Sequence, residues 1–162
     1  MLIGICSDTH GRTDALRKGL AIFDAAGIDR MVHCGDVGGT EVFDLLVGRQ
    51  AWFVWGNTDF PDAATRAYLQ TVGLPIPSRP PLLLEWADKT LAVYHGHEGA
   101  FDHAGYHPEV DYVLHGHTHL RRDDRLGQTR FINPGALHRA RVKSVATLDL
   151  TTDTLTFHEL DG

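Results

Sequence analysis

Five short polar clusters hold the side chains of this sequence that are best suited to chemistry, and each follows an apolar run. They are residues 7–11 (SDTHG), 35–36 (GD), 56–59 (GNTD), 95–97 (HGH) and 116–119 (GHTH). Carboxylate, amide and imidazole groups bind divalent metal ions, and a His-x-His pair can direct two rings at one point. The clusters therefore predict a metal site, provided that the fold brings them together.

Each cluster alone also has an ordinary structural interpretation. Asp8 or Asp36 could cap the helix that follows it, Asn57 could be a turn residue, and His95 could be a buried histidine with a hydrogen-bond partner. The histidines of YVLHGHTHL could simply share one face of a strand. Two carboxylates, an amide and several imidazoles at one place would, however, include charges that are costly to desolvate unless cations or polar partners compensate them.

The first half of the chain alternates apolar runs with helical patterns, which is typical of β-α-β units around a parallel sheet. We expect strands at residues 2–6, 30–34 and 51–55, and helices at residues 13–26, 40–47 and 62–72. Thr13 is the expected cap of the first helix, and Gly27 and Gly73 are expected to end the first and the third. Ligands of such sheets bind beyond the carboxyl ends of the strands, so the clusters should meet at one edge.

A proline-rich segment, residues 74–81 (LPIPSRPP), interrupts this pattern. After it we expect a hairpin that turns at Asp88–Lys89. Further strands are expected at residues 112–115, 130–133, 144–150 and 154–160, with turns at 125–128 and 151–153. We interpret these strands as a second, more antiparallel sheet packed on the first, because too few residues remain for two independent cores. The expected organisation is one α/β domain spanning residues 1–162.

Composition narrows the class of protein. The chain has 162 residues, of which 43% are hydrophobic, as in a single globular domain. Its longest purely apolar run is AWFVW, and no charged start precedes a hydrophobic stretch, so we expect neither a signal peptide nor a membrane-spanning helix. Cys6 and Cys34 lie in apolar runs without a CxxC pair, which predicts free thiols and a cytoplasmic protein.

Charge is unevenly distributed along the chain. The formal net charge of −6 argues against nonspecific binding along a nucleic-acid backbone. Between residues 115 and 143, however, seven bases accompany two acids, a local balance of +5 that leaves −11 for the remainder. Such an asymmetry could draw an anionic substrate to that end of the molecule, although a solvated hairpin surface would explain most of these side chains.

The identity and order of the clustered residues resemble the calcineurin-like metallophosphoesterase superfamily, whose pattern is D-x-H, GD, GN, a histidine after a strand, and GHxH. The match spans positions 8–119, and INPGA at 132–136 resembles the late Asn-Pro-Gly turn of that family. The short length is similar to that of its small bacterial and archaeal phosphodiesterases. The resemblance implies a four-layer α/β/β/α sandwich of two mixed sheets flanked by helices, and the hydrolysis of a small phosphoester.

The resemblance also implies two divalent metal ions, from among Mn, Fe, Zn, Co and Ni, with manganese favoured for a ligand set without thiolate. One ion would be held by Asp8, His10 and His119, the other by Asn57, His95 and His117, with Asp36 bridging both. An ionised carboxylate can hold two cations about 3.5–4 Å apart. A hydroxide between the ions would then attack the phosphoester in line, without a nucleophile from the protein.

One position departs from the family pattern. Many members carry a histidine after Gly-Asn that helps to protonate the leaving group, and here the residue is Thr58, whose hydroxyl is too weak an acid. We therefore expect better activity on diesters, or on substrates with acidic leaving groups, than on alkyl monoesters. His97 is our candidate for the acid, with a supporting or purely structural role as the alternative.

Several other polar residues have either a supporting role at the site or a purely structural one. Asp59 could orient a metal ligand or simply form a turn, and Arg12 could reach a substrate phosphate or remain solvated. His115 lies where the family has no ligand and is assigned to strand packing, and the turn at 133–135 is expected to shape the rim of the site. No functional role is assigned to the remaining histidines, which are His33, His103, His107, His138 and His158.

Two other functions compete with a phosphodiesterase. A retromer subunit shares this fold, has lost ligands and serves chiefly in protein assembly, so a binding scaffold is the rival from another class. Retention of every ligand position here weighs against it. A phosphomonoesterase or nucleotide phosphatase of the same fold is disfavoured by Thr58. The sequence leaves open whether the chain forms a homo-oligomer.

Overall fold

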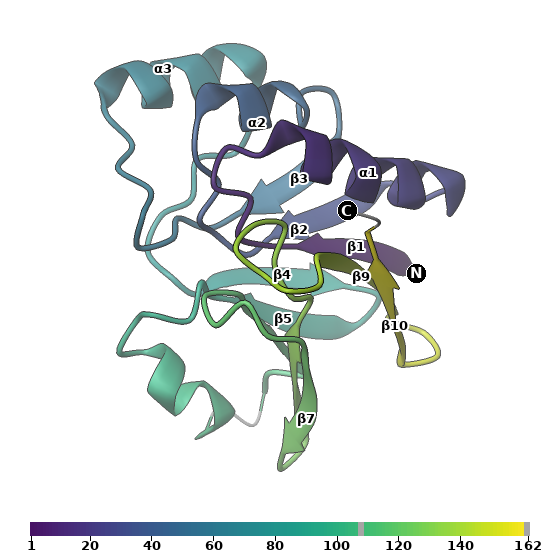
Figure 1. Cartoon of the computed structure of the whole chain (residues 1–162). Helices are drawn as coiled ribbons and strands as arrows, with labels where there is room; N and C mark the ends of the chain where they lie inside the picture. The colour runs from purple at the N-terminus through teal and green to yellow at the C-terminus, as the bar shows by residue number, and fades with distance from the viewer. Residues whose placement is uncertain (107–108, 161–162) are drawn as a thin grey trace.

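The computed structural model describes residues 1–106 and 109–160 (Figure 1). The first half contains β1 (Leu2–Cys6), α1 (Thr13–Ala25), β2 (Arg30–His33), α2 (Thr40–Asp44), β3 (Gln50–Phe53) and α3 (Ala63–Val72). The second half contains β4 (Leu82–Trp86), β5 (Lys89–Val93), the 3₁₀ helix η1 (Phe101–Tyr106), β6 (Tyr112–Leu114), β7 (Arg122–Leu126), β8 (Thr129–Asn133), β9 (Ser144–Asp149) and β10 (Thr154–Glu159). No described helix is both long enough and apolar enough to cross a membrane.

The strands form two five-stranded mixed sheets. The first has the order β10-β9-β1-β2-β3 and the second the order β4-β5-β6-β8-β7. In the first sheet β1, β2 and β3 are parallel, and in the second β5, β6 and β8 are parallel. The remaining pairings, two in each sheet, are antiparallel.

The prediction of a second, more antiparallel sheet was therefore wrong, since the two sheets have the same balance of pairings. The reason is that β9 and β10 do not join the late strands of the chain. β9 instead pairs antiparallel with β1, from Leu2 opposite Asp149 to Ile5 opposite Ala146. β9 therefore pairs with the edge of β1 that is not paired with β2.

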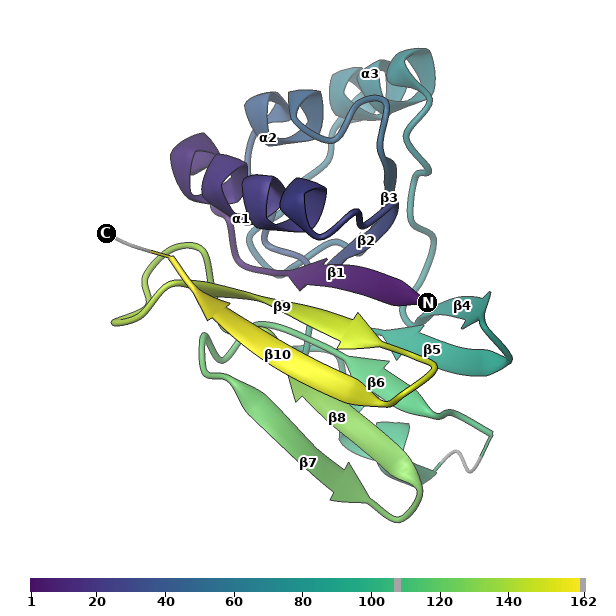
Figure 2. The ribbon, with the colours of Figure 1, turned by 90° about the vertical axis from the view of Figure 1, so that its right-hand side faces the viewer.

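The elements stack as four layers, in agreement with the expected α/β/β/α sandwich. The two sheets pack face to face through a shared apolar core that includes Ile5, Val32, Leu91 and Leu114. Helices α1, α2 and α3 cover the opposite face of the first sheet (Figure 2). In the described part of the chain, η1 alone covers the outer face of the second sheet, through a small cluster that includes Phe131.

Strand β1 shows why the alternating pattern places the layers as it does. Ile3 and Ile5 point into the core between the sheets, whereas Gly4 faces the helices. A Cβ atom at Gly4 would lie 2.7 Å from the ring of Phe23 on α1. The glycine therefore allows α1 to pack directly on the first strand.

Several predicted boundaries were wrong. Thr13 is the first residue of α1 and not its cap, because Arg12 occupies the cap position without a capping side-chain hydrogen bond. The second helix ends at Asp44 and not at residue 47, since the chain turns there toward Gly48, whose φ is 80°. Strands β2 and β3 end at His33 and Phe53, one and two residues earlier than predicted.

Two boundaries in the second half also differ from the prediction. The hairpin between β4 and β5 turns at Ala87–Asp88 and not at Asp88–Lys89, with φ angles of 51° and 59°. Strand β7 was missed because its sequence, RDDRL, has no apolar face. It is an edge strand, where one neighbour supplies all of the pairing and exposed charge is tolerated.

Candidate metal centre

The five polar clusters follow strand ends that lie at the same edge of the two packed sheets. The backbone N–H groups of Asp8 and His10 donate to the carbonyls of Gly35 and Asp36 at 3.0 and 2.9 Å. In the second sheet, Gly116 N–H donates to the His95 carbonyl at 2.8 Å. The turns are thus joined in pairs by their own backbones, which fixes the starting point of each polar side chain.

Five of the predicted ligands sit on strained backbone. Their φ angles are 55° at Asp8, 46° at His10, 52° at Asp36, 69° at His117 and 60° at His119. A left-handed conformation of a residue with a side chain costs of order 1–3 kcal/mol and clusters at functional sites. The rest of the fold therefore stabilises a strained backbone conformation that directs these side chains inward.

Asp8, His10 and His119 form the first group, in which one ligand atom from each lies within 4.8 Å of the others. Asp8 is completely buried, and its Oδ1 lies 3.2 Å from His119 Nε2. The ring of His119 is oriented from its other side, because Nδ1 donates to the carbonyl of Arg139 at 3.3 Å. Nε2 of the ring therefore faces the carboxylate of Asp8.

Asp8, Asp36 and His95 form the second group under the same limit of 4.8 Å. His95 Nδ1 donates to the Cys34 carbonyl at 2.8 Å. Its Nε2 faces Asn57 Oδ1 at 3.0 Å and Asp36 Oδ2 at 3.4 Å. Asp36 Oδ2 also lies 3.5 Å from His10 Nε2, so this carboxylate stands between the two histidines.

These contacts place imidazole nitrogens opposite carboxylate oxygens. When Nδ1 of an imidazole donates its proton to a backbone carbonyl, Nε2 is the nitrogen left to face a partner. At both His95 and His119 that partner is a carboxylate oxygen, so a proton on Nε2 or a metal cation has to lie between the two atoms. A histidine that donates one nitrogen to a carbonyl and presents the other is the usual form of a metal ligand.

His117 lies in neither of these two groups. Its ring centroid is 5.1 Å from that of His95, and its backbone N–H donates to Asp8 Oδ2 at 3.1 Å. The structure therefore brings the other six predicted ligands into direct contact and places His117 beside them. It also shows Asp8 as a member of both groups, whereas the sequence analysis assigned it to one.

Protonation states follow from burial and hydrogen bonding. Burial raises the pKa of Asp8 above its usual range, and burial lowers the pKa values of His10 and His117. Burial also disfavours the Asp36 carboxylate, but hydrogen bonds from His95 and Thr58 outweigh it and hold the pKa of Asp36 below its usual range. Burial likewise opposes a charge on His95, yet Asp36 and the Cys34 carbonyl raise its pKa. The site thus attracts positive charge.

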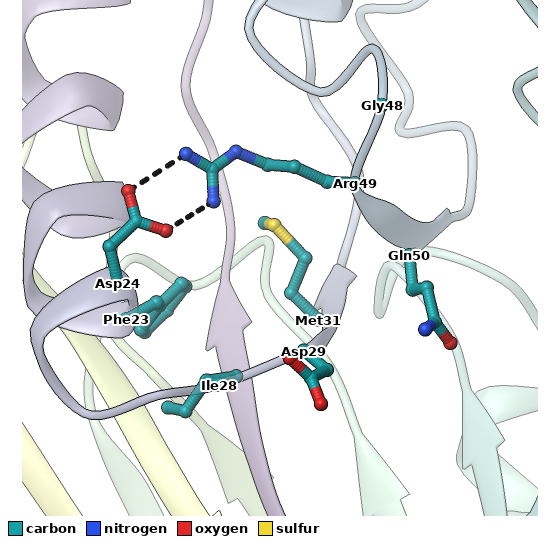
Figure 3. Close-up of a pocket in the computed structure, with 8 residues that line it drawn as sticks. All are labelled: Phe23, Asp24, Ile28, Asp29, Met31, Gly48, Arg49 and Gln50. Atoms are coloured by element: carbon teal, nitrogen blue, oxygen red, sulfur yellow. Dashed lines mark hydrogen bonds and ion pairs between the residues drawn. The ribbon is translucent and has the colours of Figure 1, made fainter.

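Unpartnered atoms show that a divalent cation fits this site. Asp8 Oδ1 and His10 Nε2 are buried and have no hydrogen-bond partner. A contrasting carboxylate lies in a pocket of about 280 Å³ at the end of α1 and the beginnings of β2 and β3 (Figure 3). There Arg49 spans the gap and donates to both oxygens of Asp24, at 2.5 and 2.9 Å. Asp24 is compensated by an arginine, whereas the described ion-pair partner of Asp8 is a histidine, His119.

Residues 1–153 match the calcineurin-like phosphoesterase superfamily domain. The chain belongs to this family. It is 28% identical over 138 residues to a phosphodiesterase of Methanocaldococcus jannaschii, covering 83% of each chain. It is 30% identical over 162 residues to a probable metallophosphoesterase of the same organism, covering 93% of this chain and 76% of the relative.

The solved structure of an archaeal phosphodiesterase is also similar, with a TM-score of 0.88 and 25% sequence identity, over 99% of this chain and 100% of that one. The chain is therefore a metal-dependent phosphoric ester hydrolase, and its two mixed sheets are those of the calcineurin-like phosphoesterase fold.

Two residues that support the site of this phosphoesterase, His33 and Glu98, were missed from the sequence or given no role. Buried His33 accepts a hydrogen bond from Gly35 N–H at Nδ1, at 3.2 Å, and its Nε2 donates to Thr9 Oγ1 at 2.6 Å. Glu98 accepts the N–H groups of His95 and Gly96 at 2.8 and 2.6 Å. The only available signals were their positions, three residues before Asp36 and directly after the HGH cluster.

Asn133 also does more than shape a turn. Its amide Nδ2 donates to the Gly116 carbonyl at 2.8 Å and to Thr118 Oγ1 at 3.1 Å, while its Oδ1 accepts from Gly135 N–H at 2.9 Å. The side chain therefore holds the GHTH turn from the end of the neighbouring strand β8. A sequence pattern could not reveal this contact, because it depends on β8 pairing with β6.

Asp59 and Thr58 both lie beside the metal centre. The carboxylate of Asp59 accepts three backbone N–H groups, from Val37, Gly38 and Gly56, at 2.8 to 3.1 Å. It thereby joins the second cluster to the third. Thr58 N–H donates to Asp36 Oδ1 at 2.9 Å, and its hydroxyl lies 3.4 Å from His10 Nδ1.

The two candidates for substrate contacts are more exposed. The ring of His97 lies 5.4 Å from that of His95 and 6.1 Å from that of His117, and its side chain is 36% exposed. His97 is therefore at the rim of the Asn57 side of the site. Arg12 is exposed at the beginning of α1, two residues after His10.

The remaining histidines are dispersed. His115 is buried against the ring of Phe101 at 4.7 Å, as strand packing requires. His158 shares a hydrogen bond with Thr147 at 2.9 Å, and His103 lies on η1. His107 falls outside the described residues. His138 is closer to the centre than expected, because its ring lies 5.8 Å from that of His10.

Proposed function

We propose that this phosphoesterase hydrolyses phosphodiesters at a centre of two divalent ions. The observation that carries the proposal is the orientation of His95 and His119, whose Nδ1 atoms both donate to backbone carbonyls, so that both Nε2 atoms face carboxylates. These histidines belong to two different groups of possible ligands, which supports one ion for each group. Asp36, which stands between His10 and His95, is suited to hold both ions.

The proposed ligands divide between two ions. One set is Asp8, His10 and His119, the other is Asn57, His95 and His117, and Asp36 is shared. The proximity of Asp8 to the second group supports a short separation between the ions. Manganese is the favoured metal for this set of nitrogen and oxygen ligands.

When bound, such ions supply a hydroxide nucleophile near neutral pH and withdraw charge from the phosphoryl oxygens. The protein holds the two imidazoles in position through the Cys34 and Arg139 carbonyls, and it keeps Asp36 ionised through Thr58 N–H. Two divalent ions against two carboxylates leave the centre positively charged, so it attracts an anionic ester. Burial of Asp8 limits screening by water and so strengthens the attraction of this carboxylate for the metal ions.

Preference for a diester rests on Thr58. Its hydroxyl lies beside His10 Nδ1 at 3.4 Å, where many family members would place an imidazole acid. A hydroxyl can position a phosphoryl oxygen but cannot donate a proton efficiently near neutral pH. An ester with a good leaving group does not need that proton, and His97 remains the candidate acid for the others.

The test measures metal content and hydrolysis on the same protein. We expect protein purified with Mn²⁺ to contain two metal equivalents per chain by mass spectrometry, and to hydrolyse bis(4-nitrophenyl) phosphate at least about tenfold faster than 4-nitrophenyl phosphate. Asp36→Asn should lose both metal and activity. Asp24→Asn, which removes a carboxylate paired to Arg49 away from the site, should retain both.

Three results would contradict the proposal, in whole or in part. Protein that neither retains metal nor hydrolyses the diester would favour a binding scaffold of the same fold. Faster hydrolysis of the monoester would favour a phosphomonoesterase. A single metal equivalent per chain with full diesterase activity would support the proposed reaction and contradict the dinuclear centre.

A further inference from the structure

Arginines of the basic stretch between residues 115 and 143 fall into two classes. Those on the β7–β8 hairpin and beside it are neutralised by carboxylates: Arg121 by Glu159, Arg122 by Asp124, Arg125 by Asp153, and Arg130 by Asp123 and Asp153. In contrast, no described carboxylate forms an ion pair with Arg139, Arg141 or Lys143. The uncompensated positive charge of this stretch is therefore confined to residues 139–143.

The start of the loop that carries these residues, positions 137–139, lies against the first metal-ligand cluster. Leu137 N–H donates to the Ser7 carbonyl at 3.1 Å, and the Arg139 carbonyl accepts from His119 Nδ1 at 3.3 Å. Between these two contacts, the His138 ring packs edge-on against the His10 ring at 5.8 Å. The loop therefore forms the rim of the site on the side of Asp8, His10 and His119.

Arg12 brings a further uncompensated charge to the same rim. It is exposed, its backbone N–H donates to the Thr9 carbonyl at 2.9 Å, and no described carboxylate pairs with its guanidinium. The His138 ring packs against the His10 ring, and Arg12 follows His10 by two residues, so the loops that carry Arg12 and Arg139 meet beside His10.

We propose that Arg12 and Arg139 bind a second anionic group of the substrate, a phosphate that lies next to the phosphodiester under attack. This inference rests on the proposed function, because it names the class of diester that the same site would take. Guanidinium groups bind phosphate through paired hydrogen bonds and keep their charge at any physiological pH. Bound metal ions would neutralise the negative charges of Asp8 and Asp36. The positive charges of Arg12 and Arg139 at the rim would then remain free for the substrate.

The opposite edge of the first sheet offers a matched control. Arg30, at the beginning of β2, also lacks a described carboxylate partner, donates to Gln50 Oε1 at 3.2 Å and lies over the Trp86 ring. Arg30→Gln therefore removes the same charge at the edge away from the metal centre. A general effect of net charge on anion binding would be the same for Arg30 and for the rim arginines.

The kinetic test compares two esters that differ by one phosphate. They are the 4-nitrophenyl ester of thymidine 5′-phosphate and the same ester with an added 3′-phosphate. For the Mn²⁺-loaded protein we expect the 3′-phosphate to lower KM by about tenfold, as one charge-assisted contact would. This advantage should disappear in Arg12→Gln/Arg139→Gln, weaken in each single variant, and persist in Arg30→Gln.

A binding measurement makes the test independent of turnover. Calorimetric titration of the Mn²⁺-loaded protein should show about tenfold tighter binding of thymidine 3′,5′-bisphosphate than of thymidine 5′-phosphate, with the same dependence on Arg12 and Arg139. Circular dichroism melting would confirm that each variant folds.

The outcomes separate this inference from the proposed function. Equal affinity for the two nucleotides in the titration, or a preference that survives the double variant, would overturn the phosphate subsite. A preference that depends on both arginines in the titration, without hydrolysis of either ester, would support the subsite and contradict the proposed diesterase.

Discussion

The backbone N–H of His117 donates to Asp8 Oδ2 at 3.1 Å, although 109 positions separate the two residues in the chain. This hydrogen bond joins the turn after β6, in the second sheet, to the turn after β1, in the first. Gly116 makes the approach possible, because a Cβ atom there would overlap Ser7 Oγ and lie 2.6 Å from Asp8 Oδ2. The metal centre is thus a junction between the two sheets.

Substitution of Gly116 should open that junction. Gly116→Ala should separate His117 and His119 from Asp8 and lower kcat/KM for a diester by on the order of 10²-fold, since a displacement of about 1 Å can have that effect. Gly99→Ala is the matched control, because nothing lies within 4 Å of a Cβ atom at that position. Equal activity of the two variants would contradict the close approach of the turns.

Metal removal should destabilise the protein as well as inactivate it. Asp8 and Asp36 are buried or nearly so, and bound cations stabilise only the folded arrangement of their carboxylates. At a metal concentration of 100 times Kd, the stabilisation would be about 2.7 kcal/mol, or roughly 5–10 °C in Tm for a chain of this size. Thermal melts with Mn²⁺ and with EDTA measure the difference. Asp8→Asn should abolish it, and a wild-type Tm unaffected by EDTA would argue against the metal centre.

Glu98 should act as a positioning residue for His95. Its carboxylate holds the N–H groups of His95 and Gly96, so Glu98→Gln should weaken Mn²⁺ binding or activity by about 10- to 100-fold. Metal affinity is measured by titration and activity by diester hydrolysis. Glu85→Gln, at an exposed position on β4, should change neither. Unaltered metal affinity and kcat in Glu98→Gln would restrict this carboxylate to a structural role.

The role of His97 can be decided by varying the leaving group. If His97 protonates the leaving group, His97→Ala should slow a phenyl ester by about 10²-fold or more and a 4-nitrophenyl ester of the same nucleotide much less, because the better leaving group needs less assistance. Steady-state kinetics on both esters provides the ratio, with His158→Ala as a control. Equal losses on the two esters would remove His97 as the acid.

His33 should make stability depend on pH. Burial lowers its pKa to about 3, whereas the unfolded chain titrates near 6.5. Between these values the unfolded state binds the additional proton, so stability is complete above about pH 6.5 and decreases as pH falls, by up to about 1.4 kcal/mol per pH unit. His33→Gln keeps a polar side chain without titrating and should show a smaller slope. Urea unfolding at pH 7, 6 and 5 measures both slopes, and identical slopes would exclude His33 as the source.

Local sequence patterns predicted the three N-terminal strands, their helices and the identity of the polar clusters, because strand alternation, helical periodicity and glycine turns depend on neighbouring residues. They did not predict β7, whose charged residues pair only as an edge strand. They also assigned β9 and β10 to the wrong sheet. Alternation shows which side chains share a face, but it does not identify the partner strand when the partner is distant in the chain.

The same distinction holds at the metal centre. The residue types and their order along the chain determined by themselves which carboxylates, amide and imidazoles are available for a divalent ion. Only the tertiary structure decided that Asp8 belongs to both groups of ligands, that Asn133 holds the GHTH turn, and that the loop of His138 and Arg139 packs against His10 and His119. The reason is that each of these relationships joins segments that are distant in the chain and that meet only when the strands pair and the two sheets pack.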